Sequence, residues 1–349
     1  MTVAIDRIDA DARFPDGGLF REDCPRCMPG CSRIQPSIPF MQRRRRLFPS
    51  AFFVLFLVAP ALDWLRFDLH ETQLWFLGRR WSLGIDDFMA GRIDATAAAL
   101  SILGRAFLPA LVLVALFLAV AWRRGRLYCG WLCPHFSLVE LINDLLHRAC
   151  ARFSLWDRHP TPRADRPAQR RWWPVFALAC VMSGFLWAIT LLSYLLPPAE
   201  LWRGLLGGTL TPGQARFLGI GTLVFSAEFA FARHLFCRFG CAVGLFQSLV
   251  WMANQKGMVV AFDRDRARDC RDCRTPASPS GSACDRSCPM RLHPRDIKRM
   301  MFSCVQCGRC LDACATSQAG QPQGPLLEWR IGVDAVRETL RQRRTDKEI

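Results

Sequence analysis

The sequence predicts an α-helical membrane protein, with about four transmembrane helices, that carries a small cysteine-rich α+β domain toward its C-terminal end. Two observations predict this fold class. Hydrophobic residues make up 51% of the 349-residue chain, and they gather in long blocks instead of spreading through it. Eight of the 17 cysteines fall between residues 270 and 314.

The transmembrane helices are expected where apolar stretches are long enough to cross a bilayer: residues 47–65, 97–122, 172–196 and 215–236. Pro60 and Pro109 lie within the first two stretches, and a membrane helix tolerates proline better than a soluble helix does. Two amphipathic runs, 136–146 and 243–252, are expected to lie along the inner membrane surface. Residues 43–262 therefore form the predicted membrane domain.

The arginines orient these spans, because short loops rich in basic residues stay on the cytoplasmic side. Residues 123–171 carry ten arginines and the segment before the first span carries nine, whereas residues 66–94 carry four arginines and five acids. Both termini are therefore expected to be cytoplasmic. The net charge of +16 then lies beside anionic lipid headgroups, which explains it without nucleic acid as a partner.

The cysteines of residues 263–320 have the spacing of iron–sulfur ligands. Cys304, Cys307, Cys310 and Cys314 follow the C-x2-C-x2-C-x3-C pattern of a bacterial 4Fe-4S site, in which the fourth cysteine serves a second cluster. The crossed pattern predicts a two-cluster ferredoxin-like domain with one cluster on Cys270, Cys273, Cys284 and Cys314, and the other on Cys288, Cys304, Cys307 and Cys310. A zinc ribbon or a disulfide framework is the alternative, and the reducing cytoplasm disfavours disulfides. Ten residues separate Cys273 from Cys284 where a ferredoxin has two.

Two further cysteine pairs share one spacing at the inner ends of two spans. Cys129 and Cys133 lie in YCGWLCPHF, and Cys237 and Cys241 lie in FCRFGCAVG. Residues i and i+4 share a helix face, so each pair can present two sulfurs to one partner. If the two turns meet, four thiols converge as a catalytic or redox site. They suit Cu(I), zinc, a third iron–sulfur cluster or a dithiol relay, and the spacing does not choose among these.

Glu228 is a carboxylate inside the fourth predicted span, where a charge is costly and often serves a proton or ligand path. It supports quinol oxidation, which needs a proton acceptor. An ion pair with Arg105 or Arg233 is the structural alternative. None of the six histidines lies in the middle of a span, so haem between the spans is not expected.

The two ends of the chain are less informative. Residues 1–42 form a leader that is predicted to be disordered and that contains Cys24, Cys27 and Cys31, a triplet with spacing suited to copper or zinc. Residues 321–349 form a predicted helical tail, whose apolar positions, among them Leu326 and Leu327, are expected to cover the ferredoxin domain.

From about residue 43 to residue 315 the chain resembles the membrane-bound polyferredoxins that include the cytochrome c oxidase accessory proteins of the FixG/CcoG/RdxA type. The resemblance rests on the basic leader and first span, on GRLYCGWLCP, on RHLFCRFGCAVGLFQS, on the two cysteine runs and on the segment after the first span, PALDWLRFDLHETQLWFLGRRWSLGIDDF. Ala242 replaces the proline expected after Cys241. The family's further span and immunoglobulin-like domain do not occur in this sequence, so a truncated member is expected.

The resemblance implies a bacterial inner-membrane electron-transfer protein that reduces Cu(II) to Cu(I) at the cytoplasmic face in support of cytochrome c oxidase assembly. Its partners would be membrane lipid, an electron donor protein or quinol, and copper-handling or oxidase assembly proteins. The alternative is a quinol-oxidising respiratory relay, similar to the membrane ferredoxins of nitrate or nitrous-oxide reduction. Whether the chain is itself an enzyme, as a metal-ion reductase or a quinol dehydrogenase component, stays open.

Overall fold

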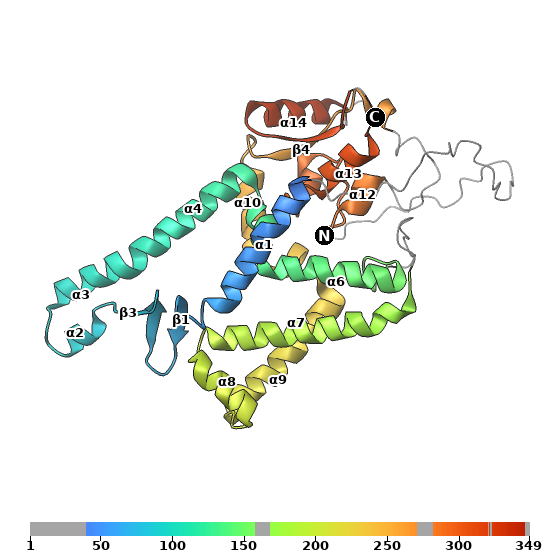
Figure 1. The fold of residues 1–349 in the computed structure, drawn as a ribbon. Helices are drawn as coiled ribbons and strands as arrows, with labels where there is room; N and C mark the ends of the chain where they lie inside the picture. The colour runs from blue at the N-terminus through green and yellow to red at the C-terminus, as the bar shows by residue number, and fades with distance from the viewer. Residues whose placement is uncertain (1–39, 158–167, 271–281, 320, 322, 346–349) are drawn as a thin grey trace, which may run out of the picture. The chain divides into compact units, whose positions relative to one another are not determined.

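The computed structural model describes residues 40–157, 168–270, 282–319, 321 and 323–345 (Figure 1). The predicted leader triplet and Cys273 lie outside the described residues. The described chain is rich in helix, and three helical segments are long and apolar enough to cross a membrane: Ala95–Arg124, Arg170–Ser193 and Pro212–Ala232. By length and composition these segments are typical of a membrane protein, and they match the second, third and fourth predicted spans.

The predicted first span does not appear as one continuous helix over residues 47–65. Helix α1 (Phe40–Val58) starts earlier and ends earlier, because Pro60 has no N–H group and disfavours helical backbone in the residue before it. The apolar part of α1 after its arginines is twelve residues, 47–58, or about 18 Å of helix. That length is shorter than the hydrocarbon core of a bilayer, which is about 30 Å thick.

The second span is built from three helical segments in series: α3 (Ala95–Ile102), the π-helical turn η1 (Leu103–Phe107) and α4 (Leu108–Arg124). The π-helical turn comes just before Pro109, which lacks the N–H group that a regular helix would use. The Asp94 side chain caps the start of α3 by accepting from the Ala97 amide at 3.0 Å. Gly125, with φ of 65°, ends α4.

The segment after α1 contains a small sheet. Strands β1 (Leu65–Asp68), β2 (Gln73–Phe76) and β3 (Arg79–Trp81) form an antiparallel meander, and the short helix α2 (Ile85–Met89) follows. The Phe67 amide donates to the Tyr194 carbonyl at 2.8 Å, which ties this sheet to the end of the third span.

The third and fourth spans pack closely through small residues. The third comprises η2 (Arg170–Trp172) and α7 (Trp173–Ser193), and after α8 (Pro198–Gly207) the fourth comprises α9 (Pro212–Ala227) and the π-helical η3 (Glu228–Ala232). A Cβ atom on Gly184 of α7 would come within 2.8 Å of the Thr222 carbonyl and the Ser226 amide on α9. Small residues allow such close approach of membrane helices.

Two cysteine-bearing turns each lead into a longer helix. The first is α5 (Leu127–Trp131), followed by α6 (Pro134–Cys150), and the second is the π-helical η4 (Phe236–Gly240), followed by α10 (Ala242–Ala253). Helix α6 lies along α7 (Figure 1), and its apolar side chains Phe136, Val139, Ile142 and Leu146 are at most 2% exposed. The apolar face expected at the membrane surface is thus buried within the protein.

The cysteine-rich domain is enclosed by two paired strands. Strand β4 (Val259–Phe262) precedes the cysteines and pairs antiparallel with β5 (Leu327–Arg330), with Val259 opposite Arg330. Between them lie η5 (Ala267–Asp269), α12 (Ala283–Ser287), η6 (Lys298–Met301) and α13 (Arg309–Ser317), and α14 (Val333–Thr345) follows. Both strands lie outside the predicted 263–320 range, and Leu326 and Leu327 are buried against the cysteines, as expected of the tail.

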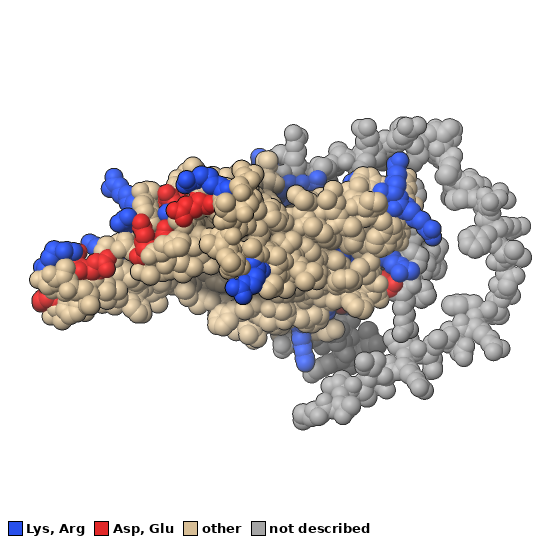
Figure 2. All heavy atoms as spheres, turned by 90° about the horizontal axis from the view of Figure 1, so that it is seen from below, with Lys and Arg blue, Asp and Glu red and all other residues tan. Residues whose placement is uncertain are grey.

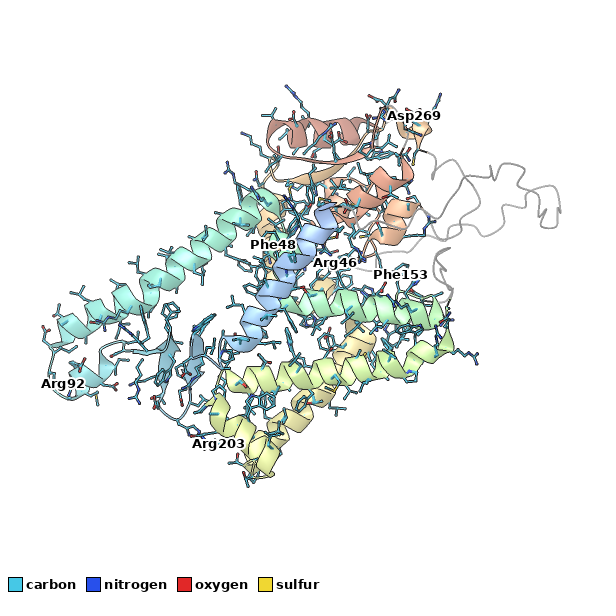
Figure 3. All side chains as sticks on the ribbon, in the orientation of Figure 1. Arg46, Phe48, Arg92, Phe153, Arg203 and Asp269 are labelled. Atoms are coloured by element: carbon cyan, nitrogen blue, oxygen red, sulfur yellow. The ribbon has the colours of Figure 1, made fainter. Side chains whose placement is uncertain are left out.

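The surface fits a membrane protein. Figure 2 shows one face as a broad area of uncharged residues, with basic and acidic side chains mainly toward its ends. Arg92 and Arg203, in the two predicted outer loops, lie on the opposite side of the ribbon from Asp269 in the cysteine-rich domain (Figure 3).

Candidate iron–sulfur sites

The two predicted ferredoxin ligand sets line two separate cavities. Cys288, Cys304, Cys307 and Cys310 line one cavity together with apolar residues that include Met290 and Val305. Cys270, Cys284 and Cys314 line the other, with Phe262 and Leu327 from the strand pair. The described members of each set are therefore brought together in the crossed arrangement, and Cys273 is the one predicted ligand that the structure does not describe.

Helix α13 produces the crossing. Cys310 and Cys314 lie four residues apart on this helix, yet each faces a different cavity, so the helix stands between the two sites. The helix begins after Gly308, whose φ of +71° lets the chain turn sharply out of the Cys304–Cys307 loop. A Cβ atom there would come within 3.1 Å of the Trp329 ring, so the glycine is also needed for space.

Hydrogen-bond donors point at the sulfur atoms in both cavities. The Leu292 amide donates to Cys288 Sγ at 3.3 Å, and the Leu326 amide donates to Cys314 Sγ at 3.3 Å. The Ser282 hydroxyl lies 3.0 Å from Cys284 Sγ. Such donors favour thiolate and tune the potential of a bound cluster.

Burial acts in the opposite direction on the free thiols. It raises the pKa of Cys288 to about 12, and it raises the pKa of Cys310 well above its ordinary value. A buried thiolate needs a positive partner, which the iron atoms of a cluster supply. The four cysteines, apolar lining and amide donor of the first cavity therefore fit a 4Fe-4S cluster, and the three described cysteines of the second cavity are compatible with another.

The two C-x3-C turns, one α-helical and one π-helical, end in the same kind of N-cap and come together. Cys133 is the N-cap of α6 and Cys241 is the N-cap of α10, both with extended backbone, so the helix starts at Pro134 in one turn and at Ala242 in the other. Burial raises the pKa of the Cys237 thiol, and the nearby sulfurs of Cys133, Cys129 and Cys241 raise it further. We call Cys129, Cys133, Cys237 and Cys241 the four-cysteine site.

Arg126 is a buried cation of this site, and nothing in the sequence pattern singled it out. Its side chain is 1% exposed, and its Nη2 donates to the Cys237 carbonyl at 2.6 Å. Its Nε and Nη1 are buried without a hydrogen-bond partner, although the guanidinium lies beside the Cys129 thiol and near Cys304. Gln247 of α10 donates to Cys129 Sγ at 3.4 Å.

The turn at Cys129 is in direct contact with the Cys304–Cys307 loop. A Cβ atom on Gly130 would lie 2.1 Å from the Val305 carbonyl oxygen, so only glycine fits there. Trp131 Nε1 donates to the Gln306 carbonyl at 3.0 Å, which fixes the turn to the loop. The four-cysteine site therefore borders the cavity of the second ligand set.

Arg45 of α1 holds this junction from the other side. It donates to the Gly130 carbonyl at 2.7 Å and to both carboxylate oxygens of Glu140 at 2.7 and 2.6 Å. The neighbouring Gln42 donates to the Cys307 carbonyl at 3.0 Å. One of the arginines ahead of the first predicted span, which were used to orient it, is thus buried in a packing contact.

Glu228 lies toward the C-terminal end of the fourth span and faces His135, a partner that the sequence did not predict. Its Oε1 is 3.4 Å from His135 Nε2, both side chains are 13% exposed, and both carboxylate oxygens are buried without a hydrogen bond. The His135 ring stacks on Phe229, with centroids 5.1 Å apart, and meets Phe236 edge-on. In the sequence, the clue to this pair is that His135 follows the C-x3-C cysteine Cys133 by two residues.

Neither arginine considered as a partner of Glu228 hydrogen-bonds to it, although Arg233 lies close enough to interact with it electrostatically. Arg105 donates to the Ser82 carbonyl at 3.0 Å. Arg233, at an unusual φ of +35°, donates to Asn143 Oδ1 at 2.9 Å and to the Phe229 and Ala230 carbonyls, which are left unpaired where the span ends.

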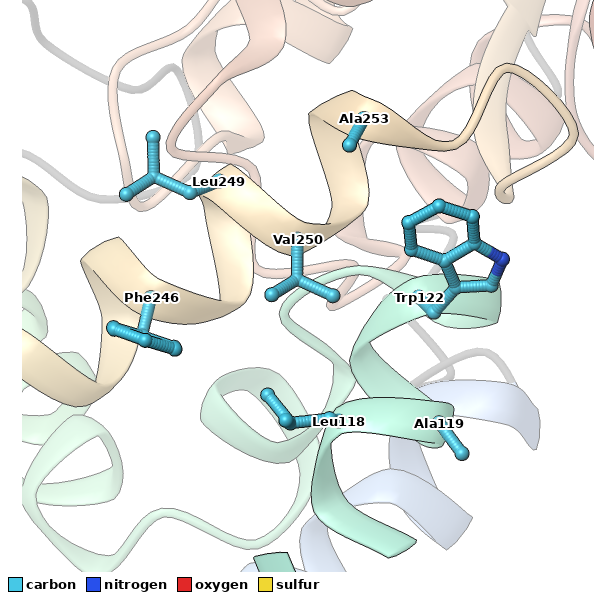
Figure 4. Close-up of a pocket in the computed structure, with 7 residues that line it drawn as sticks. All are labelled: Leu118, Ala119, Trp122, Phe246, Leu249, Val250 and Ala253. Atoms are coloured by element: carbon cyan, nitrogen blue, oxygen red, sulfur yellow. The ribbon is translucent and has the colours of Figure 1, made fainter. Parts of the chain in front are cut away.

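A groove between α4 and α10 is apolar throughout (Figure 4). Leu118, Ala119 and Trp122 face Phe246, Leu249, Val250 and Ala253 across it. It offers an acyl or isoprenoid chain a surface, but it has no group that takes up a proton. Within the described ranges, no three His, Cys, Asp or Glu side chains are arranged to hold a single metal ion.

This chain is similar to known iron–sulfur and electron transport proteins. A family model described as a 4Fe-4S binding domain matches residues 98–150, which include Cys129 and Cys133. The ferredoxin-type protein NapH of Escherichia coli K12 is 27% identical over 241 residues, covering 66% of this chain and 70% of NapH. No solved structure matches.

Two other relatives agree with this assignment. The putative electron transport protein YccM of E. coli K12 is 23% identical, covering 59% of this chain and 53% of YccM. The methylamine utilization ferredoxin-type protein MauN of Methylorubrum extorquens is 26% identical, covering 55% of this chain and 56% of MauN. The chain therefore contains a segment that matches a 4Fe-4S binding domain, and it is similar to ferredoxin-type and electron transport proteins.

Proposed function

We propose that this protein is a quinol-oxidising electron relay of the cytoplasmic membrane, which passes electrons from the membrane edge to two 4Fe-4S clusters. The observation that carries the proposal is Glu228, a buried carboxylate at the end of a span with no hydrogen-bond partner and with His135 beside it. An intramembrane carboxylate of this kind usually has a functional role.

The two clusters would be held by the crossed ligand sets. Cys288, Cys304, Cys307 and Cys310 would hold one, and Cys270, Cys273, Cys284 and Cys314 the other. The shared cavities and the sulfur-directed donors support this assignment. Bound clusters would accept and hand on one electron at a time. Both termini and the cluster domain would lie in the cytoplasm, as the arginine distribution predicts.

Oxidation of one quinol to quinone releases two electrons and two protons. In the proposed site Glu228 accepts the protons in turn and releases them to solvent, while His135 orients the carboxylate. Phe229, Phe236 and Trp187, which surround the imidazole, supply the apolar walls that a quinol ring requires. The electrons leave one by one toward the clusters.

The relatives described above are ferredoxin-type and electron-transport proteins, and their names do not mention copper or an oxidase. They favour the respiratory relay over the copper reduction implied by the FixG/CcoG resemblance. The electron acceptor would be a redox protein that docks near the cluster domain.

The test uses protein purified anaerobically in detergent with its clusters intact. A reduced water-soluble naphthoquinone is added, and cluster reduction is followed by EPR. We expect Glu228→Gln to slow this reduction by about 100-fold or more, the usual contribution of a positioned general base. Dithionite should still reduce the clusters of the variant fully.

Glu200→Gln is the matched control, because Glu200 is an exposed carboxylate on α8 and should not affect the rate. An unchanged rate in Glu228→Gln would exclude the proposed proton acceptor. Clusters that ignore quinol but are oxidised in proportion to added Cu(II) would favour copper reduction instead.

A further inference from the structure

The four-cysteine site has the features of a metal centre that is assembled from two distant parts of the chain. The matched 4Fe-4S binding segment, residues 98–150, contains three cysteines. One of them, Cys150, lies at the far end of α6 and donates to the Leu146 carbonyl at 3.4 Å. Cys129 and Cys133 therefore need two ligands from outside this segment, and the structure brings Cys237 and Cys241 to them.

The electrostatics of the site call for a bound anionic group. Arg126 is 1% exposed and keeps Nε and Nη1 without a hydrogen-bond partner. An unpaired buried charge is strongly unfavourable, so a guanidinium in this position implies a negative partner. A disulfide or a pair of neutral thiols would leave Arg126 uncompensated, whereas a centre with four thiolates carries net negative charge.

The backbone adds to this positive environment. The amides of His135 and Phe136, at the start of α6, point toward the Cys133 sulfur, and Cys241 occupies the same N-cap position at the start of α10. The N-terminal end of α6 thus faces the Cys133 sulfur, where the helix dipole stabilises an anion.

The position of the site favours a redox centre over a structural ion. Gly130 touches Val305 in the loop between Cys304 and Cys307, and Arg126 lies near both Cys129 and Cys304. Phe236, which contacts His135, directly precedes Cys237. The site therefore lies between the proposed quinol site and the cavity of the second ligand set.

We infer that Cys129, Cys133, Cys237 and Cys241 together hold a third 4Fe-4S cluster, with Arg126 as the buried group that balances its charge. The role of this cluster rests on the proposed function: it would be the first acceptor, at the membrane edge, of the electrons released from quinol. Its presence can be measured whether or not quinol is the donor.

The test is the iron and acid-labile sulfide content of the anaerobically purified full-length protein. Three clusters give about twelve irons per chain. The double variant Cys237→Ser/Cys241→Ser should lose about a third of the iron and sulfide and should keep the EPR signals of the remaining clusters. The matched control is Cys150→Ser/Cys180→Ser, which changes two helix cysteines outside the site and should retain all the iron.

Arg126→Met provides a second readout. Loss of the positive charge should shift the midpoint potential of one cluster to a more negative value, while Arg126→Lys should restore most of that shift. About eight irons in both the wild type and the double variant would overturn the inference. Stoichiometric zinc or copper that is lost with Cys237 and Cys241, without loss of sulfide, would overturn it as well. If the iron and sulfide contents are as expected but quinol does not reduce the clusters, the third cluster is upheld and only quinol is rejected as the electron donor.

Discussion

Replacing Arg45 by methionine should strongly destabilise the protein, because this arginine holds α1, the Gly130 turn and α6 together. Its side chain is 2% exposed, and its Nη2 donates to both carboxylate oxygens of Glu140, whose side chain is 17% exposed. Breaking one partner out of a buried pair costs about 3–5 kcal/mol, because the other charge is left buried. Arg309 Nη1, 3.4 Å from Glu140, retains part of the compensation. We therefore expect a loss near the lower limit, about 3 kcal/mol.

The assay is thermal unfolding of the detergent-purified protein, followed by circular dichroism, with iron content measured alongside. Arg80→Met is the control, because Arg80 pairs with Glu71 at 2.8 Å while 57% exposed. Its loss should cost less than about 1 kcal/mol. The double variant Arg45→Met/Glu140→Gln should regain part of the stability, since no charge is left unpaired. Equal shifts for Arg45→Met and Arg80→Met would refute the reasoning.

Three further predictions concern packing and pH. Burial, with the nearby arginines, lowers the pKa of His234 from 6.5 to about 4, so the unfolded chain binds a proton between these pH values that the folded chain does not. Stability should therefore fall by up to roughly 3 kcal/mol as the pH drops from 6.5 to 4, and denaturant titrations of His234→Gln should show a weaker fall. Gly184→Ala should lower the melting temperature by pushing the third and fourth spans apart, whereas Gly219→Ala, with open space around it, should not. Gly130→Ala should lower the free energy of unfolding by about 1–3 kcal/mol and weaken the contact with the Cys304–Cys307 loop. Limited proteolysis should then cleave the cluster domain faster. Cleavage no faster than in Gly219→Ala would contradict the steric argument.

The sequence predicted those features that depend on local spacing. The pattern of Cys304, Cys307, Cys310 and Cys314 fixes how a turn and a helix present sulfur, and the described members of each set indeed share a cavity. The apolar length of three spans was equally readable. The substitution of Ala242 for proline turned out to be compatible with the same turn, because the helix needs only an N-cap before it and a residue with helical backbone after it.

Other features depend on contacts between distant segments, which spacing does not encode. Arg45 looked like one more arginine of a basic leader, although it is buried against Glu140. Arg126 looked like an inner-loop charge, although it lies among the cysteines. His135 becomes the partner of Glu228 only after α6 packs against the third and fourth spans. In each case burial of a charged group was the informative observation, and burial requires the tertiary structure.

The proposed ligand sets share one property that links folding to cofactor loading. In the four-cysteine site each turn supplies two thiols, and in the ferredoxin domain Cys288 and Cys314 each complete a set whose other members lie elsewhere in the chain. No set is contained in one continuous element: the four-cysteine site needs the starts of α6 and α10 to meet, and the set with Cys314 needs the strand pair β4–β5 that lines its cavity. Ligands that meet only in the folded chain bind metal with free energy that also stabilises the fold. Iron content should therefore fall together with stability in variants such as Arg45→Met, and Arg45 also lies near enough to the Cys307 thiol to act on it electrostatically.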